Sequence, residues 1–293
     1  MYLMSNDREF EKSIYQEATV SYSPAKEKYL SLSLQSVRGI SNRYGKSIRE
    51  VEISALHQEI VPERYQRNMG TVGSHGQAKL LTSSVAVIGL GGLGGIVTEL
   101  LARMGIGRII LVDGDTYSEN NLNRQLMAVE SNLEEKKALE TAKRISQINS
   151  AVELQTHASF VGREELSNIL RGVEVAIDCL DNLQTRFALE DICQQENIPL
   201  VHGAIAGSVG QIAVIWPGYP LLASIYGDKD NYSENGDRGV EIYWGNPATT
   251  PALVGTWEVN EAIKCLLEPE SIQTNEMLHI DLSANEVNRI KIK

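Results

Sequence analysis

Short apolar runs alternate with amphipathic stretches through the middle of the chain. The runs Val85–Ile88 and Ile109–Val112 lack charged residues and are rich in β-branched side chains, as is typical of strands buried on both faces of a sheet. Between them, apolar residues recur at helical spacing from Ile96 to Met104. This alternation predicts an α/β fold, a Rossmann-like and mainly parallel sheet with helices on both faces.

Further elements follow in the same order. The pattern predicts strands at 152–156, 173–179, 198–202 and 211–216, and helices at 134–148, 163–170, 187–197 and 251–267. Apolar residues at 278–282 and 287–290 predict an antiparallel C-terminal hairpin. The connection 217–246 is polar and rich in glycine, so a functional loop, such as a lid or a substrate-binding loop, and a surface insertion both fit it.

Residues 1–60 differ in character and are interpreted as a small helical N-terminal extension, with 61–293 as the main domain. Apolar positions from Leu30 to Ile40 precede a turn at Gly45, and Ser47 and Glu50 have the spacing of a capping box. Two short helices are therefore expected. We favour a helical hairpin packed on the main domain over a DNA-reading helix-turn-helix, because the net charge is −11.

Composition narrows the class of protein. Hydrophobic residues make up 42% and charged residues 22%, which is ordinary for a soluble globular chain, and the acidic balance makes a nucleic-acid partner unexpected. The sequence has no apolar run with the features of a signal peptide or the length of a membrane span, so we expect a cytoplasmic protein. Cys179, Cys193 and Cys265 are not spaced for a disulfide or a Cys-only metal site.

A glycine-rich turn joins the first strand to its helix. Gly89, Gly91 and Gly94 form G-x-G-x-x-G around Gly92. Glycine allows a phosphate to approach the backbone N–H groups at the start of a helix, where the dipole favours an anion. Asp113 ends the next strand, nineteen residues after Gly94, where a carboxylate accepts hydrogen bonds from ribose hydroxyls. These residues predict a bound nucleotide.

The residues after Asp113 indicate which nucleotide. G-x-G-x-x-G alone is commonest in nicotinamide and flavin sites, but a dehydrogenase has no evident need for two cations beside its ribose carboxylate. Arg124 and Lys137 suit phosphate oxygens and a departing pyrophosphate. The polar residues around them are Asp115, Asn120, Asn121, Asn123 and Gln125. We therefore interpret the site as an ATP site.

Parallel sheets bind ligands beyond the carboxyl ends of their strands, which is where Asp113 and Asp181 are predicted to lie. Asp178 falls further inside its strand and is expected to be structural. Cys179 could be a nucleophile, but a small buried core residue is the favoured interpretation. His202 is the histidine placed at a strand end, where it could contact a substrate.

Together these motifs resemble the ThiF/MoeB/HesA family, the bacterial relatives of ubiquitin-activating enzymes. The resemblance starts at about Arg64 and rests on RYQRN, GLGGLGG, the D-x-D of Asp113 and Asp115 before NNLNRQ, Lys137, DCLDN and EVNEAIKCLL. It implies ATP-dependent adenylation of the C-terminal glycine carboxylate of a ubiquitin-like sulfur-carrier protein ending in Gly-Gly. The products would be an acyl-adenylate and pyrophosphate.

The resemblance also implies roles for single residues. Asp113 would hold the ribose and Asp181 would bind Mg²⁺. Phosphate contacts are assigned to Asn121, Arg124 and Lys137. Arg67, the second arginine of R-Y-x-R, would reach across a homodimer to the partner's ATP. The two C-x-x-C pairs that hold zinc in many members are missing from this sequence, so we expect no structural zinc.

Other functions remain open on the sequence alone. One is adenylation of a small-molecule or tRNA-linked carboxylate, and another is a nucleotide-sensing adaptor without catalysis. The cations Arg67, Arg124 and Lys137 argue against the adaptor, because a sensor does not need groups that stabilise a leaving pyrophosphate. No cysteine lies between Gly218 and Thr256, where some relatives carry one, so covalent transfer through this chain is not expected. The carrier, the sulfur donor and the role of residues 1–60 do not follow from the sequence.

Overall fold

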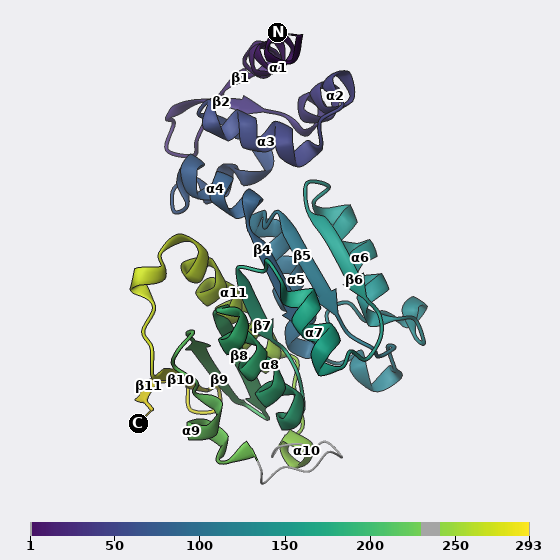
Figure 1. Ribbon diagram of the computed structural model, residues 1–293, viewed down its shortest axis with the longest axis vertical. Coiled ribbons are helices and arrows are strands. Elements are labelled where there is room, and N and C mark those ends of the chain that lie inside the picture. The colour runs from purple at the N-terminus through teal and green to yellow at the C-terminus, as the bar shows by residue number, and fades with distance from the viewer. Residues whose placement is uncertain (1, 230–240, 293) are drawn as a thin grey trace.

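The computed structural model describes residues 2–229 and 241–292 (Figure 1). Its largest element is an eight-stranded sheet of order β11-β10-β9-β8-β7-β4-β5-β6. The strands are β4 (Ser84–Ile88), β5 (Arg108–Val112), β6 (Glu153–His157), β7 (Val175–Asp178), β8 (Leu200–Ala206), β9 (Val209–Ile215), β10 (Glu276–Asp281) and β11 (Glu286–Lys291). Strands β4 to β8 run parallel, and β9, β10 and β11 continue the sheet antiparallel. The predicted fold class is therefore confirmed.

Helices cover both faces of this sheet (Figure 1). They are α4 (Gly73–Thr82), α5 (Gly92–Met104), α6 (Lys137–Ile148), α7 (Arg163–Leu170), α8 (Leu183–Glu196) and α11 (Thr249–Leu267). Strand β4 shows why its sequence is apolar throughout. Val85 and Val87 pack in the core with α5, α6 and α11, whereas Ala86 and Ile88 pack in the core with α7 and α8.

Shorter elements connect these. They are η1 (Glu63–Asn68), η2 (Glu119–Asn121), η3 (Glu130–Asn132), α9 (Leu222–Tyr226), α10 (Glu241–Trp244) and η5 (Pro269–Ser271). Helix α6 begins three residues later than predicted, because Glu134 adopts φ of 68° and Lys136 forms a β-bridge with Thr116. Of the predicted polar connection 217–246, residues 230–240 lie outside the described residues.

The N-terminal module, residues 2–62, lies at one end of the molecule (Figure 1). It contains α1 (Tyr2–Glu17), β1 (Thr19–Tyr22), β2 (Lys28–Leu32), α2 (Leu34–Tyr44), α3 (Ile48–His57) and β3 (Ile60–Pro62). Both predicted helices are present as α2 and α3, and the Ser47–Glu50 capping box forms. The placement of Leu30 and Leu32 with the first helix was wrong. These residues lie in β2, as their spacing of two residues favours.

Polar groups fix the N-terminal module to the main domain. Arg49 Nη1 donates a 2.7 Å hydrogen bond to the carbonyl oxygen of Gly107, and Arg64 Nε lies 3.1 Å from Glu52 Oε1. Asn149 Nδ2 donates to the Tyr65 hydroxyl at 3.0 Å. Burial raises the pKa of Glu52 to about 7, although Arg64 acts in the opposite direction.

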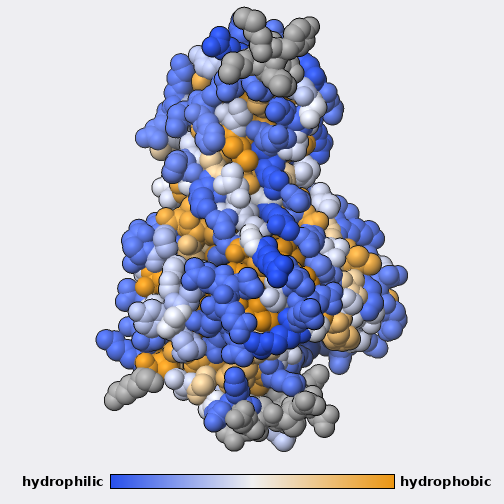
Figure 2. All heavy atoms as spheres, in the orientation of Figure 1, coloured by the Kyte–Doolittle hydropathy of each residue, from blue (hydrophilic) through white to orange (hydrophobic). Residues whose placement is uncertain are grey.

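The surface of the face drawn in Figure 2 is mostly hydrophilic, with apolar side chains in scattered groups. Among the described residues, no helix combines the length and apolar character needed to cross a membrane.

The raised pKa of Glu52 makes the stability of the folded protein depend on pH. Below the ordinary pKa of 4.5 the carboxyl is protonated in both states. Between 4.5 and about 7 only the unfolded state ionises, so the stabilisation is lost as the pH rises. Glu52→Gln changes the free energy of unfolding at each pH. We expect this change to be more favourable at pH 8 than at pH 5 by about 1–3 kcal/mol. Urea unfolding at both pH values measures this.

Glu153→Gln is the control, because Glu153 pairs with Arg49 at the same junction but is exposed. Glu153→Gln should not raise the free energy of unfolding at pH 8 by a comparable amount. An effect of Glu52→Gln that is the same at both pH values would contradict the interpretation.

Candidate functional site

The glycine turn after β4 leaves no room for side chains at two positions. Gly89 has φ of 92°, and a Cβ there would lie 2.6 Å from the carbonyl oxygen of Cys179 at the end of β7. A Cβ on Gly94 would lie 1.9 Å from the carbonyl oxygen of Gly89. Glycine is therefore required at both positions, and the N-terminus of α5 comes to rest against the ends of β4 and β7.

A cavity of about 950 Å³ opens at the carboxyl ends of the parallel strands, and we call it the strand-end cavity. Most of the predicted nucleotide-site residues line it, although they come from several elements. They are Gly89, Gly91, Gly92, Asp113, Asp115, Arg124, Gln125, Lys137 and Asp181. The structure thus gathers a glycine turn, two cations and three carboxylates around one cavity.

Gly94, Asn121 and Arg67, which the sequence also assigned to the nucleotide site, do not line this cavity. Gly94 lies behind the turn and packs on Gly89. Asn121 is 7% exposed and holds η2, because its Oδ1 accepts the Ser118 N–H at 3.1 Å. The phosphate contact predicted for Asn121 does not fit this position.

Arg67 is the third of these residues. It lies in η1, two residues after Tyr65, whose ring would meet a Cβ placed on Gly105. Gly105 follows the last turn of α5, whereas the cavity lies at the first turn. Arg67 therefore belongs to a segment that packs near the amino ends of the parallel strands, whereas the cavity lies at their carboxyl ends.

The charged residues of the cavity are held by hydrogen bonds. Lys137 Nζ lies 3.1 Å from Asp115 Oδ2, and the Lys137 side chain is only 8% exposed. Asp113 Oδ2 accepts the Leu90 N–H at 2.7 Å, which ties β5 to the glycine turn. Arg124 Nη1 donates to the Asn120 carbonyl oxygen and to Asn123 Oδ1, both at 2.8 Å. Both cations are thus held in defined orientations by neighbouring side chains and backbone.

Gln125 lines the cavity and carries a buried acceptor without a partner among the described residues. Its side chain is 7% exposed, and its Oε1 is buried without a hydrogen-bond partner within the part of the chain that the structure describes. A buried acceptor without a donor is costly. A ligand that carries hydroxyl or amino donors, as a nucleoside does, would satisfy this atom.

A buried polar network lies beneath the cavity. His202 Nδ1 lies 2.7 Å from Asp178 Oδ2, and Arg186 Nη1 donates to the Gly203 carbonyl oxygen at 2.9 Å. Burial alone would raise the pKa of Asp178, but Arg186 and His202 hold it below its ordinary value. Burial lowers the pKa of His202, so the ring is neutral and donates Nδ1–H to Asp178. Its Nε2 then accepts from the Tyr226 hydroxyl at 2.9 Å.

This network corrects one prediction. His202 is 0% exposed and does not line the strand-end cavity, so its position does not allow the substrate contact that the sequence left open. It orients Asp178 and Tyr226 instead. Cys179 lines the cavity but is 8% exposed, and burial together with Glu258 raises the pKa of its thiol well above the ordinary value. A protonated, buried thiol fits the core role favoured from the sequence.

Sequence reasoning missed part of the cavity wall. The additional lining residues include Phe160, Arg186, Ala204, Ala206, Val209, Gln211, Tyr226, Trp244, Asn246 and His279. Phe160 could have been found, because it follows β6 at the same edge as Asp113. Tyr226, Trp244 and Asn246 belong to the connection 217–246, for which a functional loop was one of the two interpretations. The others come from segments more than 60 residues from the glycine turn and carry no motif.

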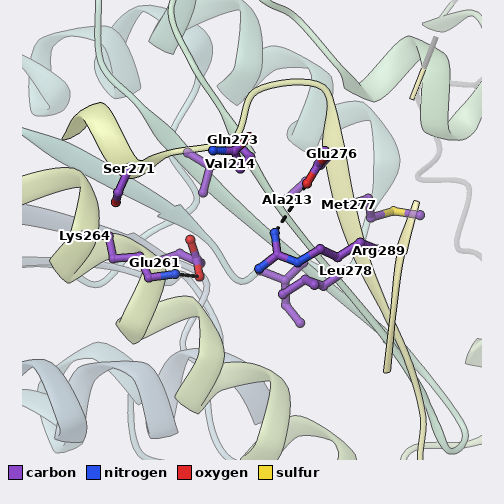
Figure 3. A pocket seen from close by; sticks show the side chains of 11 residues that line it. Ala213, Val214, Glu261, Lys264, Ser271, Gln273, Glu276, Met277, Leu278 and Arg289 are labelled. Carbon is purple, nitrogen blue, oxygen red and sulfur yellow. Dashed lines mark hydrogen bonds and ion pairs between the residues drawn. The ribbon is translucent and has the colours of Figure 1, made fainter. Parts of the chain in front are cut away.

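A second, smaller cavity of about 330 Å³ lies between the end of α11 and strands β9 to β11 (Figure 3). Its charged side chains pair with one another. Lys264 Nζ lies 2.7 Å from Glu261 Oε1, and Arg289 Nη1 lies 3.3 Å from Glu276 Oε2. These pairs account for the charges drawn there, so this cavity does not compete with the strand-end cavity as the candidate site.

Comparison with known proteins identifies the family of this chain. Residues 65–293 match the ThiF family. The SAMP-activating enzyme E1 of Haloferax volcanii is 32% identical over 221 residues, which cover 75% of this chain and 81% of that protein. The molybdopterin-synthase adenylyltransferase of Haemophilus influenzae is 29% identical over 82% of this chain and 98% of its own length. The match to the adenylyltransferase and sulfurtransferase MOCS3 of Drosophila yakuba spans only 64% of that longer protein.

Solved structures share the fold. The crystal structure of PaaA covers 79% of this chain with a TM-score of 0.66 and 18% identity. The crystal structure of Escherichia coli MccB with ATP covers 87% of this chain with a TM-score of 0.63 and 18% identity. At this identity the likeness concerns the fold alone.

The contact of Gly94 with the glycine turn gives a direct test. Gly94→Ala places a Cβ against backbone, so the turn must move. We expect a loss of about 2–4 kcal/mol of stability and at least a tenfold weaker affinity for ATP. Thermal unfolding and isothermal titration with ATP measure the two effects.

Gly39→Ala is the matched control, because Gly39 lies inside α2 with nothing within 4 Å of its Cβ position. It should raise stability by about 0.5–1 kcal/mol and leave ATP affinity unchanged. Equal effects of the two substitutions would show that the contact at Gly94 does not constrain the turn.

Proposed function

Because this chain belongs to the ThiF family, we propose that it adenylates the C-terminal glycine carboxylate of a small ubiquitin-like sulfur-carrier protein. One observation carries the proposal: the strand-end cavity combines a phosphate-binding glycine turn with Arg124, Lys137 and Asp181. Two relatives have names that describe related chemistry, a SAMP-activating E1 and a molybdopterin-synthase adenylyltransferase.

In this reaction a carboxylate oxygen of the carrier attacks the α-phosphorus of ATP. An oxygen–phosphorus bond forms to give the acyl-adenylate, and the bond to the β-phosphate breaks to release pyrophosphate. The backbone N–H groups at the start of α5 hold phosphate oxygens, and Asp113 holds the ribose. Arg124 and Lys137 stabilise the charge that moves onto pyrophosphate. No general base is needed, because the attacking carboxylate is already ionised.

Asp181 is the proposed residue for a magnesium ion. Mg²⁺ usually keeps several waters and takes one or two carboxylates together with substrate phosphates. Asp181 lines the same cavity as the glycine turn, so its carboxylate fits this role. When bound, the ion would neutralise charge on the phosphates.

The carrier tail has room on one side of the nucleotide. The cavity continues from the glycine turn to β8 and β9, where Ala204, Ala206 and Val209 line it. These three side chains are small and apolar, and the longer side chains of Gln211 and His279 line the cavity on neighbouring strands. A tail ending in Gly-Gly fits this part of the cavity because it carries no side chains.

A second copy of the chain would supply the remaining cation. The segment that carries Arg67 packs near the amino ends of the parallel strands, away from its own cavity. Arg67 would therefore act only on the ATP of a partner. Three exposed apolar side chains flank the nucleotide residues: Leu126 at 49%, Val129 at 49% and Leu139 at 52%. Leu126 follows the Arg124 loop and Leu139 lies in α6 with Lys137, so a partner that covered them would lie next to the site.

ATP–pyrophosphate exchange tests the reaction. We expect exchange that requires both the protein and a carrier ending in Gly-Gly, measured against a panel of such carriers with Mg²⁺ present. Asp181→Asn should lower exchange by at least 100-fold. Asp191→Asn is the control, because Asp191 is part-exposed on α8 and pairs with Arg163 outside the cavity. Exchange supported by small carboxylates and by no carrier would refute the protein-tail substrate.

Subunit mixing tests the role of Arg67. Arg67→Ala and Arg124→Ala should each be nearly inactive, because each removes a cation from every site. In a mixed dimer one site carries both substitutions and the other carries neither, so equal mixing should restore about a quarter of wild-type activity. A mixture no more active than its parents would contradict action across a dimer.

A further inference from the structure

We propose that Asn246 binds the tail of the adenylated protein, with its side-chain oxygen accepting a backbone N–H from that tail. The inference rests on the proposed function and adds a residue that recognises the substrate. Asn246 lines the strand-end cavity, and its Oδ1 is buried without a hydrogen-bond partner in the regions that the structure describes. Such an atom needs a donor, and a ligand in the cavity can supply one.

The position of Asn246 indicates which ligand supplies this donor. The backbone next to it is fixed to the turn between β8 and β9, because Gly207 N–H donates to the Gly245 carbonyl oxygen at 2.8 Å. Thr250 Oγ1 holds the same turn by donating to the Gly207 carbonyl oxygen at 2.7 Å. In the sheet order, β8 lies three strands from β5, which carries Asp113 at its end. At the usual strand spacing this is about 14 Å.

That separation excludes the nucleoside as the donor. Ribose hydroxyls and the adenine amino group would lie at the Asp113 side, and the ionised phosphates between offer only acceptors. A peptide tail carries one N–H per residue, and glycine retains it. The part of the cavity beside Asn246 is the part lined by Ala204, Ala206 and Val209, which the tail is proposed to occupy. A tail in this part of the cavity would bring its peptide N–H groups next to Asn246.

Asn123 positions Asn246 relative to the phosphates. Asn123 Nδ2 donates to the Asn246 carbonyl oxygen at 3.1 Å, and Asn123 Oδ1 accepts from Arg124 Nη1 at 2.8 Å. One side chain thus connects a phosphate-binding arginine to the backbone of the tail-binding residue. This link sets the distance between the tail and the α-phosphorus, so Asn123 is a positioning residue.

The first test separates tail binding from nucleotide binding. In carrier-dependent pyrophosphate exchange, Asn246→Ala should raise the KM for the carrier about tenfold and change the KM for ATP less than about twofold. Asn260→Ala is the matched control, because Asn260 is exposed on α11 and lies outside the cavity. It should change neither constant. Asn123→Asp keeps an acceptor for Arg124 but loses the donor to Asn246, so it should raise the KM for the carrier as well.

The second test identifies the hydrogen bond itself. Synthetic tail peptides are N-methylated at one residue at a time, which removes single N–H groups. With wild-type protein, methylation at one position should weaken binding about tenfold, and with Asn246→Ala the same methylation should have little further effect. Binding is measured with ATP present, so misfolding of the variant would appear as loss of ATP affinity.

These measurements distinguish the two proposals. If no carrier or tail peptide supports exchange, the proposed function fails. The role of Asn246 is refuted, while the function stands, if exchange proceeds but Asn246→Ala leaves the KM for the carrier unchanged. It is also refuted if every methylation weakens binding to Asn246→Ala as much as binding to wild-type protein.

Discussion

The tight backbone contact between the glycine turn and the end of β7 is the constraint on which the site depends. Neither Gly89 nor Gly94 leaves space for a Cβ, because backbone carbonyl oxygens lie within 2.6 Å and 1.9 Å of those positions. The contact brings the N-terminus of α5 to the carboxyl ends of the parallel strands. There the helix dipole, Asp113 from β5 and Asp181 after β7 face one cavity. A side chain at Gly89 or Gly94 would displace the helix end from the other residues.

A buried network of charged and polar side chains positions part of the wall of that cavity. Arg186 is almost fully buried, and a charge in such a place is tolerated only when it is paired and hydrogen-bonded. Asp178 lies 3.6 Å from it, and the carbonyl oxygens of Gly203 and Leu180 accept from the same guanidinium. Because Arg186 and Tyr226 also line the cavity, the network joins the core of the sheet to the surface that would meet the substrate. His202 contributes as a neutral ring that connects Asp178 to Tyr226.

The N-terminal module is followed directly in the chain by the segment that carries Arg67. Strand β3 is buried in its small sheet and leads directly into η1, which carries Arg67. Arg64 and Tyr65 in η1 bind Asn149 of the main domain, so the segment is held from both sides. Under the proposed arrangement, the module of one copy would be attached directly to the residue that completes the site of the other.

The sequence by itself determined the class of fold and the glycine turn, because these depend on local properties. Charge-free β-branched runs, helical spacing and obligatory glycines leave their pattern within a few residues, so β4, α5 and Asp113 could be placed from Val85 onward. Tertiary structure alone decided the rest of the wall. Arg186, Ala204 and Gln211 line the same cavity as the glycine turn only when the sheet forms, and no local pattern predicts that contact. It also decided that His202 is buried and that η1, which carries Arg67, packs beside the last turn of α5, because both depend on packing between distant segments.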